Sequence, residues 1–211
     1  LYILDQNKET RIIDANAMDY SCWGESIFVA TRGREIREYN NELNQMVMSY
    51  HYDNIADSYL SKIAIYKMNI YASTKNGRII RWNIGEDVAT LVTDLREEIT
   101  DFVIREDVFY VVTDNGSLYK VKEDGVFDVL YSGSYRWRAM DIAQDIIAMT
   151  SIDGAIMVFD YKDCSSEIIM DKSKEYAIPY LKIEGCTFIG VDTTYLSEQF
   201  IKDMKALGAV F

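Results

Sequence analysis

The sequence predicts an all-β architecture built from repeated four-stranded units, and three observations support this fold class. A five-residue pattern recurs along the chain: an aliphatic residue, two variable residues, a bulky apolar residue and then usually Asp or Asn. Its copies begin near residues 1, 36, 79, 118 and 156. Turn-forming residues precede several copies, and the 211 residues include a single proline, which paired strands exclude. A period of about 40 residues is typical of the four-stranded blades of a β-propeller.

Hairpin turns are expected directly before the last three copies. The dipeptides at these places are Asn76-Gly77, Asn115-Gly116 and Asp153-Gly154. Each follows an apolar run rich in β-forming residues, and Asn-Gly and Asp-Gly favour a type I′ turn, in which both central residues have φ > 0. The sequence therefore predicts three type I′ hairpins. An earlier copy has Gly33-Arg34 instead, with the glycine one position early, which predicts another type of turn there.

One repeat shows the expected blade most clearly. Residues 99–104 read as an inner strand, 108–113 as the second strand, 117–121 as the third and 126–131 as the outer strand. By the same reading the chain starts inside a blade, with a third strand at 1–5 and a fourth at 9–13. Four complete blades then follow and end near Asp171.

The number of blades depends on the residues that follow. Segments 180–184 and 186–191 read as two further strands. They either pair with the two N-terminal strands and close a ring of about five blades, or the chain is part of a larger propeller. Beyond 194 the apolar spacing changes to that of a helix, predicted over 198–207 with Ser197 as its N-cap. We therefore expect a propeller over 1–191 and a short helical tail over 192–211.

Composition excludes several classes of function. The chain has 34 acidic and 22 basic residues and a net charge of −12, so its field opposes binding to nucleic acid or to an anionic membrane surface. No apolar run approaches the length of about 18 residues that a membrane helix needs. Cys22, Cys164 and Cys186 form no CxxC pair, which favours reduced, mostly packed thiols and a cytoplasmic protein. With one histidine, no metal site and no cofactor are expected.

Two aromatic segments are the candidate binding sites for a protein or peptide partner. They are Tyr50-His51-Tyr52 and Tyr135-Arg136-Trp137-Arg138. Both are expected between an outer strand and the next inner strand, at one rim of the propeller, and Trp, Tyr and Arg are enriched at binding hot spots. The alternative is that side chains such as Tyr135 and Trp137 pack between blades. A third cluster, Arg32, Arg34 and Arg37, is either a solvated surface or a receptor for an acidic segment.

Catalytic constellations are sparse. Asp101 and Asp141 fall on predicted inner strands, where two carboxylates facing a central channel would serve a propeller hydrolase or lyase. Alternatively, each aspartate accepts hydrogen bonds from neighbouring backbone. His51 is expected in a loop and solvated. The sequence therefore favours a non-catalytic interaction module over an enzyme.

The repeats resemble those of the WD40 family, most closely over Thr74–Asn83 and Ser151–Asp160. The resemblance covers residues 1–171, although no copy has a Trp-Asp pair and none has a Gly-His dipeptide before an inner strand. It implies a scaffold or sensor without catalytic activity.

The tail also resembles a known group of proteins. Residues 181–188, 196–198 and 208–209 are similar to the terminal segment of bacterial signalling ATPases of the NACHT or STAND type, whose C-terminal sensor is a WD40 propeller. This resemblance implies a larger parent protein with upstream domains. That expectation agrees with a chain that begins at Leu1 and lacks a GxxxxGK[ST] phosphate loop.

Overall fold

The computed structural model describes residues 2–4, 10–12, 16–40, 45–53, 59–171 and 202. The chain divides into two compact units, Leu1–Asp171 and Lys172–Phe211. In the second unit the structure describes Lys202, which is helical. The predicted strands at 180–184 and 186–191 and most of the predicted helix at 198–207 lie outside the described residues.

The first unit contains four four-stranded antiparallel sheets, which we call blades 1 to 4. Blade 1 consists of β3 (Ala17–Trp23), β4 (Ser26–Thr31), β5 (Glu35–Asn40) and β6 (Gln45–His51). Blade 2 consists of β7 (Leu60–Tyr66), β8 (Asn69–Thr74), β9 (Arg78–Asn83) and β10 (Thr90–Asp94). Blade 3 consists of β11 (Ile99–Arg105), β12 (Val108–Thr113), β13 (Ser117–Lys122) and β14 (Phe127–Ser132). Blade 4 consists of β15 (Trp137–Ala143), β16 (Ile146–Ser151), β17 (Ile156–Asp160) and β18 (Ser165–Met170).

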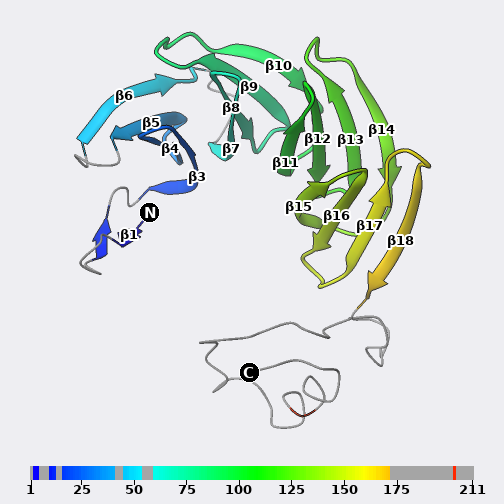
Figure 1. Ribbon diagram of the computed structural model, residues 1–211. Coiled ribbons are helices and arrows are strands. Elements are labelled where there is room, and N and C mark those ends of the chain that lie inside the picture. The colour runs from blue at the N-terminus through cyan, green and yellow to red at the C-terminus, as the bar shows by residue number, and fades with distance from the viewer. Residues whose placement is uncertain are drawn as a thin grey trace. The chain divides into compact units, whose positions relative to one another are not determined.

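Each blade is a meander in which consecutive strands pair, and successive blades follow one another along the chain (Figure 1). The predicted blade of residues 99–131 is confirmed to within one residue at each strand end. Short β1 (Tyr2–Leu4) and β2 (Thr10–Ile12) form an antiparallel pair, as predicted for the third and fourth strands of an additional blade.

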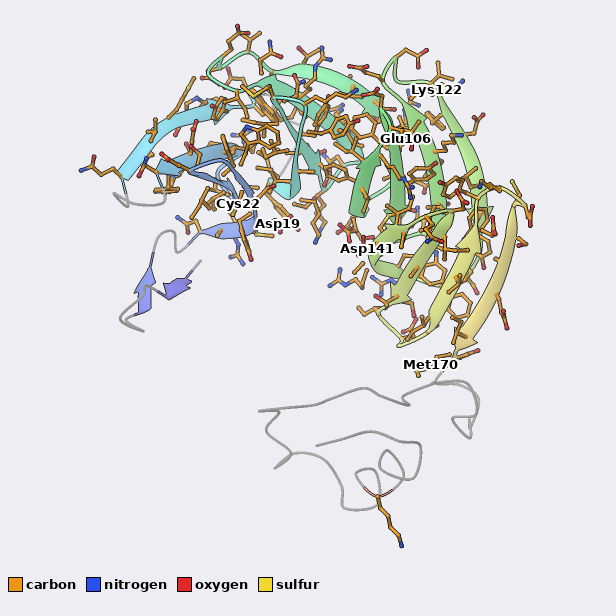
Figure 2. The ribbon with its side chains drawn as sticks, in the orientation of Figure 1. Asp19, Cys22, Glu106, Lys122, Asp141 and Met170 are labelled. Atoms are coloured by element: carbon orange, nitrogen blue, oxygen red, sulfur yellow. The ribbon has the colours of Figure 1, made fainter. Side chains whose placement is uncertain are left out.

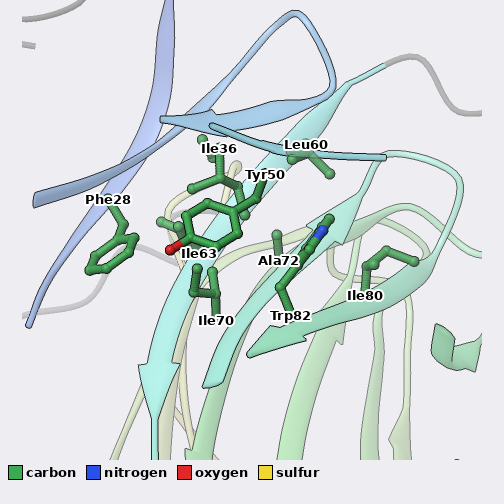
Figure 3. Close-up of a cluster of buried hydrophobic side chains, with 10 residues drawn as sticks. Phe28, Ile36, Tyr50, Leu60, Ile63, Ile70, Ala72, Ile80 and Trp82 are labelled. Carbon is green, nitrogen blue, oxygen red and sulfur yellow. The ribbon is translucent and has the colours of Figure 1, made fainter. Parts of the chain in front are cut away.

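The core lies between blades rather than within them. The first strands of neighbouring blades contact one another, β3 with β7, β7 with β11 and β11 with β15. Three buried apolar clusters fill the interfaces between blades 1 and 2, blades 2 and 3, and blades 3 and 4. Figure 3 shows the first, in which Tyr50 and Phe28 of blade 1 meet Trp82 and Ile70 of blade 2. Stability therefore depends on contacts between neighbouring repeats.

The recurring five-residue pattern is explained by burial on both faces of the third strand. Its two apolar positions are three residues apart, so in a strand they point to opposite faces. In β9, Ile79 packs toward blade 3 while Trp82 packs toward blade 1, and both are fully buried. In β13, Leu118 and Val121 divide in the same way between blade 4 and blade 2. The pattern thus marks a strand that is covered by both neighbouring blades.

The Asn-Gly and Asp-Gly dipeptides do form hairpins between the second and third strands, but the predicted type I′ geometry is wrong. Positive φ occurs only at the glycine of each dipeptide, with 94° at Gly77, 90° at Gly116 and 81° at Gly154. The glycine N–H donates a hydrogen bond to the carbonyl three residues earlier, at 3.1–3.2 Å. This is a three-residue loop, a type I turn followed by a left-handed residue. At the first repeat Arg34 holds the left-handed position, with φ of 61°.

Glycine is required at two of these turns for a second reason, because the connection that follows the outer strand packs on it. A Cβ atom at Gly77 would lie 2.5 Å from the carbonyl oxygen of Glu97, and one at Gly116 would lie 2.3 Å from that of Gly133. The glycines therefore let the two segments approach to backbone contact.

Type I′ geometry occurs elsewhere, at hairpins between first and second strands. The two-residue loop Lys67-Met68 joins β7 to β8, and its φ values are 47° and 63°. The loop Glu106-Asp107 joins β11 to β12 with 52° and 63°. Neither loop contains glycine, so the sequence carried no signal for them, and each residue bears the steric cost of the left-handed region.

Met68→Gly is expected to stabilise the protein by about 1 kcal/mol, because glycine adopts positive φ without that steric cost. Met68 is 57% exposed, so little packing is lost. The measurement is the free energy of unfolding in urea. The control is Met46→Gly in β6, where the methionine is equally exposed (58%) but lies in extended backbone. Glycine should destabilise the protein there, and a similar effect at both positions would contradict the turn assignment.

Candidate functional site

The structure places the two predicted aromatic segments at different positions of their blades. Tyr50 and His51 are the last residues of the outer strand β6, and Tyr52 follows it. In contrast, Tyr135 and Arg136 lie in the connection after β14, and Trp137 and Arg138 begin β15. The register shows the offset, since Tyr50 pairs with Ile36 and its counterpart in blade 3 is Tyr131, which pairs with Leu118. The expected equivalence of the two segments is therefore corrected.

Tyr50 and Trp137, two of the seven candidate partner-binding residues, lie in the core and have no exposed surface. The Tyr50 hydroxyl donates to Glu38 Oε2 (2.7 Å) and accepts from the Gly85 N–H (3.0 Å), and burial raises its pKa to about 12. The Trp137 indole N–H donates to the Gly116 carbonyl at 3.2 Å. These side chains pack between blades, the alternative that the sequence left open for Trp137.

The remaining residues of the second segment differ in exposure. Arg136 is exposed, and its guanidinium forms a two-pronged ion pair with the Asp114 carboxylate at 2.8–3.2 Å. Tyr135 is partly buried against the Trp137 ring, and its hydroxyl donates to Asp171 at 3.1 Å. Arg138 is exposed. Arg136 and Arg138 therefore keep their predicted place at the surface, and a partner-binding role for them stays a prediction.

His51 couples two blades. Its Nδ1 lies 2.7 Å from Asp87 Oδ2, in the loop that joins β9 to β10 of blade 2, and its Nε2 lies 3.7 Å from Glu35 in blade 1. Its carbonyl accepts a hydrogen bond from the Trp82 indole at 3.1 Å. The hydrogen bond to Asp87 raises the pKa of His51, and the negative charges of Asp87, Glu35 and Asp53 add to the effect.

We expect the contribution of His51 to stability to fall as pH rises. A folded-state pKa above the unfolded value of 6.5 gives stability that is fully present below 6.5 and lost as pH rises through the folded pKa. Since His51 is the only histidine, its NMR titration gives one curve. The midpoint should lie above 6.5 and move down in Asp87→Asn. A midpoint at or below 6.5 would exclude the Asp87–His51 pair in solution.

Asp101 and Asp141 both accept hydrogen bonds from backbone N–H groups. The Asp101 side chain is only 14% exposed, and its oxygens accept hydrogen bonds from the N–H groups of Phe102 (3.0 Å) and Met140 (2.9 Å). Burial raises its pKa. Asp141, at the inner strand β15 (Figure 2), accepts from the N–H of Ile142 at 2.8 Å. The backbone-bonding alternative is therefore the observed one for both aspartates.

Asp101 instead connects blades. Its Oδ2 reaches Met140 of blade 4, and the Lys62 ammonium of blade 2 lies 3.6 Å from its Oδ1. Asp19, at the corresponding position of blade 1 (Figure 2), accepts from the N–H of Ile63 in blade 2 at 3.0 Å. Both aspartates directly follow a β-bulge in the first strand.

The structure also tests the expectations for the cysteines, the arginine cluster and a metal site. Cys22 and Cys164 are free thiols as expected, but both are exposed rather than packed. Arg37 pairs with Glu35, and Arg32 contacts the Met18 sulfur. Among the described residues no group of three or more His, Cys, Asp or Glu side chains is placed to hold a metal ion. In the same part of the chain, no helix is long and apolar enough to cross a membrane.

The structure adds one site that the sequence did not indicate. A hollow of about 630 Å³ opens between the β8–β9 turn and the connection after β10, and it is lined by Lys75, Asn76, Arg78, Asp94, Arg96 and Glu98. Three of the six residues are basic, in a chain of net charge −12. The available signal was the pair Lys75 and Arg78, which flank the Asn-Gly dipeptide. It was missed because Arg96 and Glu98 join the site only through the fold.

Comparisons with known proteins show the fold. No protein-family model matches the sequence, and no curated protein matches it. The WD40 repeats of RRP9 superpose with a TM-score of 0.66 at 13% identity, covering 74% of this chain and 52% of that one. The structure of U3-55K gives 0.65 at 14% identity, covering 73% and 51%. The computationally designed Ika4 protein gives 0.56 at 13% identity, covering 68% and 90%.

This chain spans about half the length of the RRP9 and U3-55K structures. Identities of this size carry information about the fold and none about partners. Together with the four antiparallel blades, they show that this chain has the fold of a WD40-like β-propeller.

Proposed function

We propose that this propeller is a non-catalytic protein-interaction module that binds its partner through the loop face. We define the loop face as the turns 32–34, 75–77, 114–116 and 152–154 together with the connections 52–53, 95–98 and 133–136. By the meander topology, these segments lie at the same end of every blade. Interaction surfaces of rigid scaffolds are commonly carried on such loops.

One observation carries the proposal: backbone hydrogen bonds fix the loops to one another. Leu95 N–H donates to the Gly77 carbonyl at 2.8 Å, and Gly133 N–H donates to that of Gly116 at 3.1 Å. The next blade is tied in as well, since Asp114 N–H donates to Glu98 O (3.0 Å) and Ile152 N–H to Arg136 O (2.9 Å). A preorganised surface loses little conformational entropy when it binds.

The test is quantitative co-purification of partners from the source cells. Arg136→Glu in the loop face, combined with Arg138→Glu beside it at the start of β15, should reduce partner recovery at least about tenfold, since interface arginines are frequent hot spots. Glu106→Lys is the control, because this exposed residue lies on a first-to-second-strand turn at the opposite end of its blade. The proposal fails if nothing is retained above a bare matrix, or if both variants have equal effects.

We also propose that the parent is a larger cytoplasmic signalling protein with an upstream ATPase domain. The tail resemblance described above supports this, and the fold adds only that a propeller is a suitable sensor. Reading the complete gene tests the proposal, since a GxxxxGK[ST] loop should precede the propeller and its absence would exclude a parent of this type.

A further inference from the structure

We infer that the hollow lined by Lys75 and Arg96 binds an Asp or Glu carboxylate of an acidic protein partner. This inference rests on the proposed interaction function and specifies the chemistry of the partner. Both cations are exposed, and they come from the two segments that line the hollow: Lys75 from the β8–β9 turn and Arg96 from the connection after β10.

One of the two acidic residues of the hollow, Asp94, is already engaged. Both oxygens of Asp94 accept hydrogen bonds, Oδ2 from Arg78 Nε at 3.0 Å and Oδ1 from the backbone N–H of Arg96 at 3.1 Å. Glu98 adds a second negative charge, so the six lining residues carry three positive and two negative side chains. Among the described residues neither Lys75 nor the Arg96 guanidinium forms an ion pair, and the Lys75 ammonium lies 5.9 Å from the centroid of the Tyr59 ring. Positive charge is therefore left over within a strongly acidic protein.

The equivalent junction of the next blades shows what a closed site looks like. Asp114 follows Thr113 as Lys75 follows Thr74, and Arg136 precedes β15 as Glu98 precedes β11. Asp114 and Arg136 close their junction with a two-pronged ion pair. At the hollow the signs are exchanged, and no ion pair joins Lys75 to Glu98 among the described residues. Lys75 is therefore not neutralised by the carboxylate of its own junction, and a carboxylate of a partner can pair with it instead.

The connection that lines one side of the hollow is anchored on both sides of Arg96. The Leu95 side chain is buried in the core between blades 2 and 3 and anchors the connection, and Glu97 accepts a hydrogen bond from the Thr113 hydroxyl at 3.0 Å. Arg96 has φ of 59°, a left-handed conformation that non-glycine residues rarely adopt. Strained backbone of this kind persists where the surrounding structure imposes it, often at binding sites.

The test uses the acetylated, amidated peptide Gly-Ser-Glu-Asp-Glu-Asp-Gly-Ser and the isotopically labelled chain. NMR shift changes should concentrate at 75–78 and 94–98. Lys75→Gln combined with Arg96→Gly should weaken binding at least about tenfold, since two charge-assisted contacts are lost. Glycine suits the left-handed position of Arg96, so this variant keeps its backbone. The control, Lys67→Gln with Lys122→Gln, removes the same charge from exposed positions outside the hollow and should change binding less than about twofold.

Three results would overturn the inference. Equal weakening by the two double variants would show unspecific attraction. Displacement of the peptide by inorganic phosphate at a lower concentration than by acetate would assign the hollow to phosphate instead. If the unmodified chain captures partners through the loop face but does not bind the acidic peptide, the inference alone is refuted. If the unmodified chain binds the acidic peptide but captures no partner, the proposed function is refuted.

Discussion

Trp137→Ala is expected to destabilise the protein by about 3–5 kcal/mol, the range for truncating a buried tryptophan. The Trp137 ring is fully buried between blades 3 and 4, with Tyr131 and Tyr135 at centroid distances of 6.2 and 5.4 Å. Removing it leaves a cavity at an interface on which both blades depend. The measurement is urea-induced unfolding followed by far-ultraviolet circular dichroism.

Two further variants separate the sources of this effect. Trp137→Phe keeps most of the ring and loses the hydrogen bond to Gly116 O, which still accepts from Gly133 N–H, so a loss of about 1 kcal/mol is expected. Trp23→Ala removes a tryptophan that is 42% exposed and should cost about 1 kcal/mol or less. Equal losses in Trp137→Ala and Trp23→Ala would refute the burial of Trp137.

The burial of Trp137 also affects how binding by its variants is interpreted. A binding defect in Trp137→Ala would report disruption of the interface between two blades rather than loss of a contact with a partner. Arg138, the next residue along the chain, is exposed and tests the surface itself.

Asp101→Ala is expected to destabilise the protein by about 2–3 kcal/mol, because it orphans two backbone N–H groups in a largely buried place. The groups belong to Phe102 and Met140, in blades 3 and 4. The substitution also removes the partner of the Lys62 ammonium in blade 2. A single carboxylate thus joins three blades, and its removal should lower the midpoint of urea unfolding.

Asp141→Ala is the matched control. Asp141 lies on the first strand of blade 4, two residues beyond the position that corresponds to Asp101 in blade 3. Like Asp101, it accepts a hydrogen bond from the backbone N–H of the residue that follows it. It is exposed, so water replaces the lost acceptor and the expected cost is at most about 1 kcal/mol. Asp101→Asn should lie between the two, since the amide keeps one acceptor oxygen but turns an NH₂ group toward the other N–H. Equal effects of Asp101→Ala and Asp141→Ala would refute the role of Asp101 in joining blades.

The candidate site was only partly predictable. The connection that holds Tyr135 and Arg136 was predicted correctly, whereas Tyr50 and His51 end an outer strand. The sequence predicted a rim position for Tyr50 and left Trp137 open between rim and core, because hot-spot composition does not reveal burial. Tyr and Trp are enriched at interfaces and equally suited to the core, where their polar atoms find partners. The hollow at Lys75 and Arg96 depends on the approach of two segments separated by about 20 residues, which no local pattern encodes.

The turns show the same division. Asn-Gly marked where the chain reverses, because a left-handed glycine is needed in either type of hairpin. The type itself followed from the loop length, since the paired strands leave three loop residues at 75–77 and at 114–116 instead of two. At Lys67-Met68 the two-residue connection between paired strands requires positive φ at residue types that rarely adopt it. The sequence therefore contains no signal for this turn.

The sequence by itself determined the repeat, the strand order within each blade and the all-β class, because hydrophobic spacing and turn residues are local properties. The third-strand pattern was particularly informative, since burial on both faces needs apolar residues at an odd spacing, as in Ile79 and Trp82. Only the tertiary structure decided which aromatic side chains are buried, how Asp101 is used and where positive charge is left without an acidic partner. These depend on the contact of one blade with the next, and that contact brings together residues that are distant along the chain.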